Sequence, residues 1–135
     1  MMQKVSGIGG VFFKSKDPRA LQKWYAERLG VEPEWGADSD NGSGRSFRWK
    51  SADPPHAPGT TVWSLFPRDT KYFTPGNASF MINYRVDDLD KMLAQLRSAG
   101  VEVDEKIEES EFGRFGWAVD PEGNRIELWE PPEGM

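Results

Sequence analysis

The sequence DPEGNRIEL at residues 120–128 decides how the end of this chain folds. Its first four residues fit a type I turn, because proline occupies the second position and glycine the fourth. The flanking stretches, FGWAV at 115–119 and RIELW at 125–129, read as strands. We therefore expect an antiparallel hairpin, and alternation along its last strand separates two faces. Ile126 and Leu128 share one face, and the other carries Arg125, Glu127 and Trp129.

The chain repeats itself, and its first half contains a counterpart of each of these elements. VFFKSKDPRALQKWYAERLGV at residues 11–31 matches INYRVDDLDKMLAQLRSAGV at residues 82–101. FRWK at 47–50 occupies the place of FGWAV, and both are followed by Asp-Pro. TVWSLF at 61–66 is the counterpart of the last strand. An internal repeat of this length indicates two similar modules.

Each copy carries the start and stop signals of a helix. Asp17 and Asp88 stand at N-cap positions, and Pro18 follows as the first helical residue of the first copy. Apolar residues then recur at helical spacing up to Gly30 and Gly100, which suit the left-handed conformation after a helix end. Strands around residues 31–35 and 101–106 are expected to complete each half as βαβββ. The resulting halves are about 5–68 and 78–132, within a single α+β domain of residues 1–135.

The composition restricts the chemistry. In 135 residues, 37% hydrophobic and 13% aromatic side chains provide a real core. There is no cysteine and only one histidine, which excludes disulfides, thiolate zinc sites and a cysteine nucleophile. That histidine, His56, lies in the proline-rich stretch 53–59 and is expected to be a solvated loop residue.

The charge and hydropathy of the chain restrict its partners and location. The formal net charge of −5 argues against nucleic acid as a partner, because phosphate binding draws on clustered Lys and Arg. No apolar run is long enough for a membrane span, and the N-terminal residues do not form a signal peptide. We expect a cytoplasmic protein that does not bind membranes.

The motifs quoted above resemble those of the vicinal oxygen chelate superfamily, which contains glyoxalase I, extradiol dioxygenases and bleomycin resistance proteins. Residues 120–128 are the most diagnostic, because they look like the superfamily's closing hairpin. The resemblance implies two tandem βαβββ modules that form a cup-shaped mixed sheet, with helices on the outer face and a ligand in the cup. It also implies a homodimer, and it leaves open whether one chain or two chains build the cup.

Metal-dependent members of the superfamily hold their ion at four positions, on the first and last strand of each half. Carried over by resemblance, these positions are Gly10, Ser64, Met81 and Glu127, with Trp63 in place of Ser64 if the register moves by one residue. Only Glu127 can ligate a metal, and one carboxylate does not hold a divalent cation usefully. We therefore expect no metal and no cofactor, which argues against glyoxalase and dioxygenase activity.

Strand alternation predicts which side chains line the cup. The predicted ligand-binding residues are Phe12, Lys14, Trp63, Ser64, Asn83, Arg85, Trp117, Glu127 and Trp129. Glu127 is also the candidate catalytic base, and the alternative is a framework carboxylate paired with Arg85 or Arg125. The aromatic side chains have an alternative role as ordinary core.

Three functions are compatible with these residues. The first is a metal-free protein of the bleomycin-resistance type, which binds and sequesters a small organic molecule in its cup. The second is an enzyme of the same superfamily, such as a lyase, an isomerase or a dioxygenase, with Glu127 as the reacting group where no metal is used. The third is a regulatory or partner-binding domain.

Overall fold

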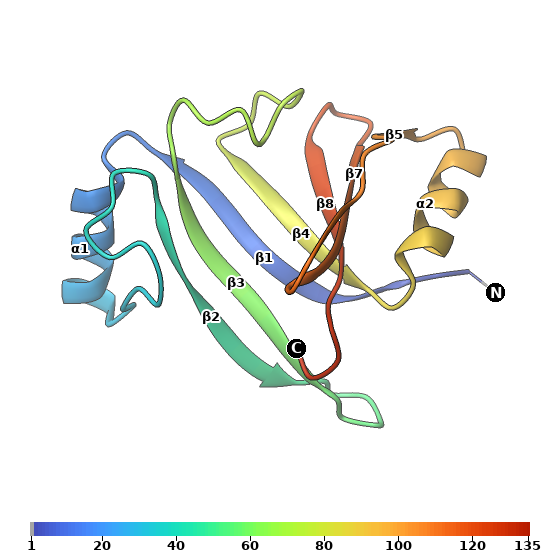
Figure 1. Cartoon of the computed structure of the whole chain (residues 1–135), viewed down its shortest axis with the longest axis horizontal. Helices are drawn as coiled ribbons and strands as arrows, with labels where there is room; N and C mark the ends of the chain where they lie inside the picture. Colours follow the sequence, from blue (N-terminus) through green and yellow to red (C-terminus); the bar gives the residue numbers. More distant parts are fainter. Residues whose placement is uncertain (1) are drawn as a thin grey trace.

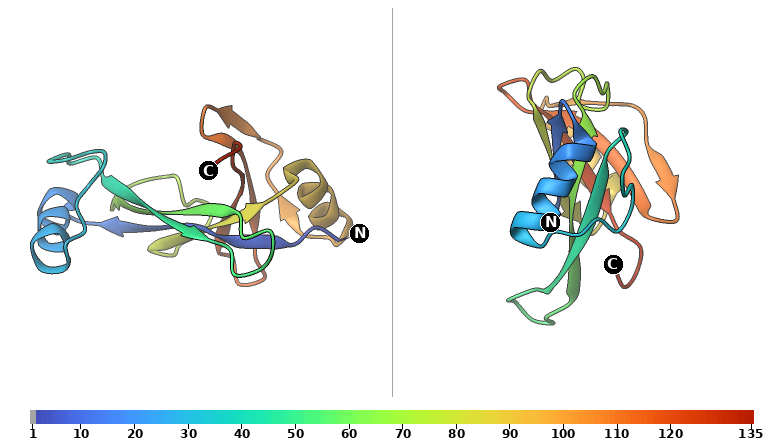
Figure 2. Two further views of the ribbon diagram at one scale, coloured as in Figure 1. Left: turned by 90° about the horizontal axis from the view of Figure 1, so that it is seen from below. Right: turned by 90° about the vertical axis from the view of Figure 1, so that its left-hand side faces the viewer.

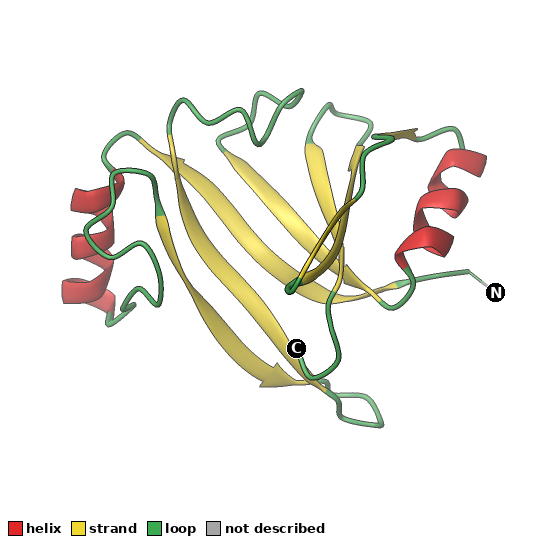
Figure 3. Ribbon diagram, viewed as in Figure 1, coloured by secondary structure: helices red, strands yellow, loops and turns green. Residues whose placement is uncertain are grey.

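The computed structural model describes residues 2–135 as a curled open sheet with two helices (Figures 1 and 3). The helices are α1 (Pro18–Leu29) and α2 (Leu89–Ser98). The strands are β1 (Val5–Ser15), β2 (Ser43–Lys50), β3 (Pro58–Pro67), β4 (Phe80–Val86), β5 (Glu102–Val103), β6 (Glu108–Ser110), β7 (Gly113–Val119) and β8 (Arg125–Glu130). The predicted α+β class and cup shape are confirmed.

The sheet joins the two halves of the chain at its centre. Its eight strands run in the order β2-β3-β1-β4-β8-β7-β5, with β6 added to β7. Strands β1 and β4, the first strand of each half, pair antiparallel, whereas β1 pairs with β3 and β4 pairs with β8 in parallel. Viewed from its other sides, the sheet carries α1 and α2 at opposite ends (Figure 2). One chain therefore builds the whole concave surface.

Both helices begin and end as the sequence predicts. The Asp17 carboxylate accepts a hydrogen bond of 3.1 Å from the backbone amide of Ala20, and Asp88 accepts one of 3.0 Å from Lys91. These bonds satisfy amides that have no partner within the helix. Gly30 ends α1 in the left-handed conformation, at φ 70°.

The closing hairpin of β7 and β8 forms around the predicted turn. The amide of Gly123 donates to the carbonyl of Asp120 over 3.0 Å. Hydrogen bonds from the backbone and side chain of Asn124, and from the amide of Glu122, hold the pKa of Asp120 below its ordinary value. The hairpin places Trp117 directly opposite Glu127.

One predicted strand is absent, and another is shorter than predicted. Residues 31–35 form no strand, and Trp35 contributes only an isolated bridge to Gly44. Pro33 lacks a backbone N–H, which makes this stretch a poor strand. The strand predicted at 101–106 is reduced to β5, because Asp104 accepts a hydrogen bond from the amide of Lys106 and turns the chain.

The core lies on both sides of the sheet. On the outer side, α2 packs on the sheet through a buried cluster of Val86, Leu89, Met92, Leu93 and Leu128. On the concave side, a second cluster consists of Phe12, Phe73, Met81 and Trp117. Phe12 of the second cluster also lines a cavity on the concave side of the sheet.

Candidate functional site

A cavity of about 400 Å³ lies on the concave side of the sheet, and we call it the aromatic cup. Its walls are Phe12, Phe66, Phe115 and Trp129, with Trp35 and Phe112 contributed by loops. Its polar groups belong to Ser46, Ser64, Tyr72, Asn83 and Glu127. A concave apolar site with a few convergent polar groups is typical of small-molecule binding.

Glu127 is the buried carboxylate of the aromatic cup. Its side chain is 1% exposed and accepts three hydrogen bonds, from Asn83 Nδ2 over 2.7 Å, from Trp117 Nε1 over 2.9 Å and from the Tyr72 hydroxyl. Burial raises the pKa of Glu127 because it disfavours the charged form, and the three hydrogen bonds act in the opposite direction.

The alternative expectation that Glu127 pairs with an arginine is wrong. Among residues 2–135 no arginine or lysine forms an ion pair with this carboxylate. Arg85 instead lies between the rings of Trp49 and Trp129, with centroid distances of 5.4 and 5.2 Å. Arg125 contacts Asp104. The direct contacts of Glu127 are therefore with neutral donors, and the nearby charge of Arg125 favours the ionised carboxylate without an ion pair.

Tyr72 reaches Glu127 from the loop between β3 and β4. Its ring stacks on Phe66 with centroids 5.6 Å apart, which fixes the direction of the hydroxyl. Burial raises the pKa of Tyr72, and the neighbouring Glu127 charge raises it further. The phenol therefore stays protonated and acts as a donor to the carboxylate.

Asn83 completes the polar floor of the aromatic cup and has spare hydrogen-bonding capacity. It pairs with Glu127 in the register of β4 and β8, which explains why the two side chains meet. Its Oδ1 is buried and has no hydrogen-bond partner among the described residues. Gly9 makes room for this amide, because a Cβ at Gly9 would overlap Asn83 Oδ1 and approach Trp129 to 2.8 Å.

The structure brings five of the nine predicted ligand-binding residues to the aromatic cup. These are Phe12, Ser64, Asn83, Glu127 and Trp129. Trp117 does not line the cup but contacts two lining residues, Glu127 by a hydrogen bond and Tyr72 edge-to-face, and the guanidinium of Arg85 lies over the ring of Trp129. Lys14 is on the concave side, but its ammonium lies over the ring of Phe73, 5.5 Å from the centroid.

Trp63 is the one predicted residue on the opposite side of the sheet. Its ring packs against Tyr25 of α1 and against Phe13, with centroids 5.0 and 5.7 Å away. Ser64 pairs with Phe12 in the register of β3 and β1 and faces the cup. The expected position of Trp63 was therefore wrong, because a shift of one residue moves a side chain to the other face.

Several residues that line the aromatic cup were not predicted from the sequence. Strand parity could have found Val62 and Phe66, which flank Ser64, and Phe115, which shares a face with Trp117. No local pattern marks Tyr72, Trp35 or Phe112, because loops bring them to the cup.

The donor set does not fit a metal ion. Of the four positions implied by resemblance, Gly10 has no side chain and Met81 is buried in the inner cluster. The Ser64 hydroxyl donates to the carbonyl of Ser43 over 3.1 Å. Glu127 faces three hydrogen-bond donors, which would repel a cation placed among them. Within the described part of the chain, no three His, Cys, Asp or Glu side chains gather in one place.

Comparison with known proteins establishes the class. Residues 10–129 match the family described as glyoxalase-like domain, and the chain belongs to that family. This match confirms the glyoxalase-like resemblance predicted from the sequence. No curated protein matches the chain significantly in sequence.

Three solved structures illustrate the similarity. Methylmalonyl-CoA epimerase from Mycobacterium tuberculosis has a TM-score of 0.62 and 23% identity, covering 95% of this chain and 89% of that one. A variant of the Streptomyces coelicolor methylmalonyl-CoA epimerase, in complex with 2-nitronate-propionyl-CoA, has a TM-score of 0.70 and 17% identity, covering 98% and 99%. The Mn(II)-bound glyoxalase from Novosphingobium aromaticivorans has a TM-score of 0.64 and 22% identity, covering 96% of this chain and 40% of that one.

At these identities the neighbours show the fold, and they do not transfer an activity. The Mn(II) of the glyoxalase is a property of that protein, and the donors of the present chain do not reproduce a metal site. Neither helix of residues 2–135 has the length and apolarity needed to cross a membrane.

Proposed function

We propose that the chain binds a planar aromatic molecule in its aromatic cup, without a metal ion. The ligand carries an N–H or O–H group that donates to Glu127 or Asn83. The observation that supports this proposal is a buried amide oxygen, Asn83 Oδ1, that has no hydrogen-bond partner among the described residues and lies beside the buried Glu127 carboxylate in an aromatic cavity. Buried acceptors without partners are costly, and a ligand donor offsets that cost.

The shape of the cup favours a flat ligand over a flexible chain. Phe115 and Trp129 stack with an interplanar angle of 5°, and Phe66 and Tyr72 stack at 13°. These two stacks form walls whose rings contact a flat ligand at low entropic cost. A ligand held in this way is sequestered, which is the role that the sequence resemblance suggests.

Two matched probes test the proposal. 2-Naphthol and 2-methoxynaphthalene have the same ring system and differ in a single O–H donor. We expect both to bind by isothermal titration calorimetry, with 2-naphthol tighter by about tenfold, because a hydrogen bond to a charged group contributes about 1.5–3 kcal/mol. Absence of binding by both, or equal affinity for both, contradicts the proposal.

Variants locate the binding in the cup. Phe115→Ala is expected to weaken both probes, since it removes one ring of a wall. Glu127→Gln keeps the shape and removes the charge, and it is expected to reduce the preference for 2-naphthol to about threefold or less. Trp24→Ala is the matched control, because Trp24 is a half-exposed aromatic residue of α1 outside the cup. It should bind both probes like the original chain.

The second candidate function is an enzyme in which Glu127 accepts a proton from a bound carbon acid. It is favoured by the burial that raises the pKa of Glu127 and makes its carboxylate a stronger base. Proton NMR in D₂O with the probes and related C–H acids distinguishes the two. Deuterium incorporation that is lost in Glu127→Gln supports the enzyme, and unchanged ligand supports sequestration.

A further inference from the structure

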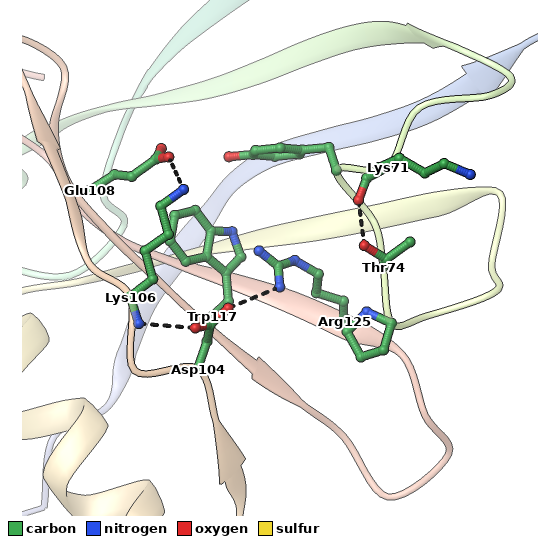
Figure 4. A pocket seen from close by; sticks show the side chains of 9 residues that line it. Lys71, Thr74, Asp104, Lys106, Glu108, Trp117 and Arg125 are labelled. Atoms are coloured by element: carbon green, nitrogen blue, oxygen red, sulfur yellow. Dashed lines mark hydrogen bonds and ion pairs between the residues drawn. The ribbon is translucent and has the colours of Figure 1, made fainter.

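A second cavity, of about 600 Å³, opens beside the aromatic cup, and we call it the polar chamber (Figure 4). Residues 71–75 of the β3–β4 loop lie on one side of it and residues 104–108 on the other. Trp117 and Arg125 form its floor on β7 and β8. Arg125 and Glu127 are two residues apart on β8 and share its concave face. The chamber and the cup are therefore neighbouring parts of one concave surface.

Tyr72 is the boundary between the two spaces, since its side chain lines both. Its hydroxyl and Trp117 Nε1 meet on the same oxygen of Glu127. A ligand that fills the aromatic cup and extends past Tyr72 would place its far end in the polar chamber. The groups available there determine which ligands can do so.

Arg125 is held in place but has unused donors. Its side chain is 14% exposed, and its guanidinium lies 4.9 Å from the centroid of Trp117. Its Nη1 lies 3.5 Å from a carboxylate oxygen of Asp104, and Figure 4 shows this ion pair as a dashed line. The Arg125 side chain makes no hydrogen bond to any residue in 2–135. The buried Nε has no acceptor. A guanidinium has five N–H donors in a fixed plane, so most of this one is available.

Two other arginines of this half, Arg114 and Arg85, donate side-chain hydrogen bonds, so the unused donors of Arg125 are unusual here. Arg114 makes hydrogen bonds of 2.9 and 3.1 Å to Asp90 and one of 3.0 Å to Glu109. Arg85 donates to the carbonyls of Thr60 and Met135. Arg125 differs from both because it makes a single ion pair, to Asp104, and no side-chain hydrogen bond among residues 2–135, which leaves donors for an acceptor supplied by a ligand.

The charges around Arg125 also favour an anion, although the chain as a whole is acidic. Lys71, Lys106 and Arg125 line the chamber against Asp104 and Glu108, three cations to two carboxylates. Lys106 is paired with Glu108 over 2.9 Å, and among the described residues Lys71 forms no ion pair. The cation in excess is therefore Lys71, whose ammonium points away from Arg125 in Figure 4, so Lys71 adds positive charge near the chamber without contacting Arg125.

We propose that the polar chamber binds an oxyanion group, a carboxylate or a phosphate, at the far end of the ligand held in the aromatic cup. Arg125 is the principal contact, because its plane matches two anionic oxygens at once. This inference rests on the proposed function. It narrows the ligand to a planar aromatic acid whose donor group and oxyanion are separated by about 7 Å, the spacing of alternate residues along a strand.

A series of naphthalene compounds tests the inference on the full chain. 2-Naphthol carries the donor alone, and 6-hydroxy-2-naphthoate adds a carboxylate at the opposite end of the same ring system. We expect 6-hydroxy-2-naphthoate to bind about tenfold more tightly than 2-naphthol by calorimetry, because a new charge-assisted contact is added. Comparison of 2-naphthoate with 2-naphthyl phosphate identifies which oxyanion is preferred.

Variants of Arg125 test whether the tighter binding of 6-hydroxy-2-naphthoate depends on the polar chamber. Arg125→Gln is expected to abolish the tenfold difference while the affinity for 2-naphthol changes by less than about twofold. Arg125→Lys keeps the positive charge but lacks the planar guanidinium, so it should retain only part of the tenfold difference in affinity. This second variant keeps the inference testable if Arg125→Gln does not fold. Arg28→Gln removes the same charge from the exposed last turn of α1 and is the control.

The outcomes separate the two proposals. Equal binding of 2-naphthol and 6-hydroxy-2-naphthoate by the original chain overturns the polar chamber and leaves the aromatic cup intact. The polar chamber is also overturned, and the aromatic cup retained, if Arg125→Gln weakens the binding of both compounds equally. If no compound of the series binds, the proposed function fails and the inference fails with it.

Discussion

The hydroxyl of Tyr72 donates a hydrogen bond to the carboxylate of Glu127, although 55 positions separate the two residues in the chain. Glu127 lies on β8, and Tyr72 belongs to the loop between β3 and β4. The bond closes one side of the aromatic cup and ties the two halves of the chain together. It also makes the β3–β4 loop part of the site rather than a simple connection.

Removal of the Tyr72 hydroxyl tests the energetic contribution of this bond. Tyr72→Phe leaves a buried carboxylate with one donor fewer, and we expect the free energy of unfolding to fall by about 1.5–3 kcal/mol. Urea denaturation at neutral pH measures the difference. Tyr84→Phe, at a half-buried tyrosine that packs on the outer cluster, is the matched control. An equal loss in both variants would show that the bond to Glu127 contributes nothing specific.

Burial of Glu127 makes the stability of the protein depend on pH. Because the folded-state pKa is raised, the native state binds a proton more readily than the unfolded state. The contribution of Glu127 is therefore fully present below its ordinary pKa of 4.5 and is lost as the pH rises through the raised value. We expect the original chain to lose stability relative to Glu127→Gln as the pH rises above 4.5 and through the raised pKa of Glu127.

Denaturation curves of both proteins across this range measure that difference. Shifts at Asp90 and Asp120 are common to both proteins and cancel in the comparison. Glu105→Gln, at an exposed carboxylate, is the control and should follow the original chain. A difference that stays constant with pH, or one that grows in favour of the original chain, contradicts the prediction.

The space at Gly9 is needed for the polar floor of the cup. Gly9→Ala would force Asn83 and Trp129 to move, since the new Cβ overlaps the amide oxygen. We expect a loss of about 1–3 kcal/mol in stability, as for other overpacked cores, and weaker binding of 2-naphthol. Val11→Ala, at a partly exposed residue of the same strand, is the control for both measurements. Retention of full affinity by Gly9→Ala would show that Asn83 does not contact the ligand.

The elements that could be predicted from the sequence are those set by local interactions. The N-caps at Asp17 and Asp88 and the turn at 120–123 depend on residues a few positions apart. The floor residues Asn83 and Glu127 followed from strand parity, which also depends on short stretches. The strand expected at 31–35, which would have completed the first half as βαβββ, is absent, and a repeat does not guarantee that each strand is present in both copies.

The rest of the site depends on long-range contacts. Whether Trp63 or Ser64 faces the cup is decided by the register of β3 against β1, which alternation alone does not determine. Tyr72 is in a loop that has local turns at Thr70 and Thr74, and the packing of its ring on Phe66, which directs the hydroxyl to Glu127, is not marked by any local pattern. The unpaired state of Glu127 could not be predicted either, because it depends on where the arginines Arg85 and Arg125 find their contacts.

The location of Trp63 gives a test that separates stability from binding. Its ring packs on Tyr25 and Phe13 between α1 and the sheet, away from the cup. We expect Trp63→Ala to lower the free energy of unfolding by about 2 kcal/mol, less than for a fully buried tryptophan. Its affinity for 2-naphthol, measured well below the melting temperature, should equal that of the original chain. If Trp63→Ala lost affinity for 2-naphthol without losing stability, Trp63 would have to contact the ligand.

The donor set predicts the response of the protein to divalent metals. Mn²⁺ or Zn²⁺ would have to displace Tyr72, Asn83 and Trp117 from Glu127, and none of the other three implied positions supplies an ionised ligand. We therefore expect neither ion to raise the melting temperature and EDTA to leave the affinity for 2-naphthol unchanged. Elemental analysis of the purified protein measures the metal content directly. A triple variant with Gly10→His, Ser64→His and Met81→Glu introduces ligating side chains at the three implied positions, and at position 10 the ring of Phe12 has to move, because it lies 2.6 Å from the place of the new Cβ. Near-stoichiometric metal in the original chain would overturn the metal-free proposal, whereas stabilisation by Mn²⁺ in the variant alone would show that only the side chains, and not the fold, prevent binding.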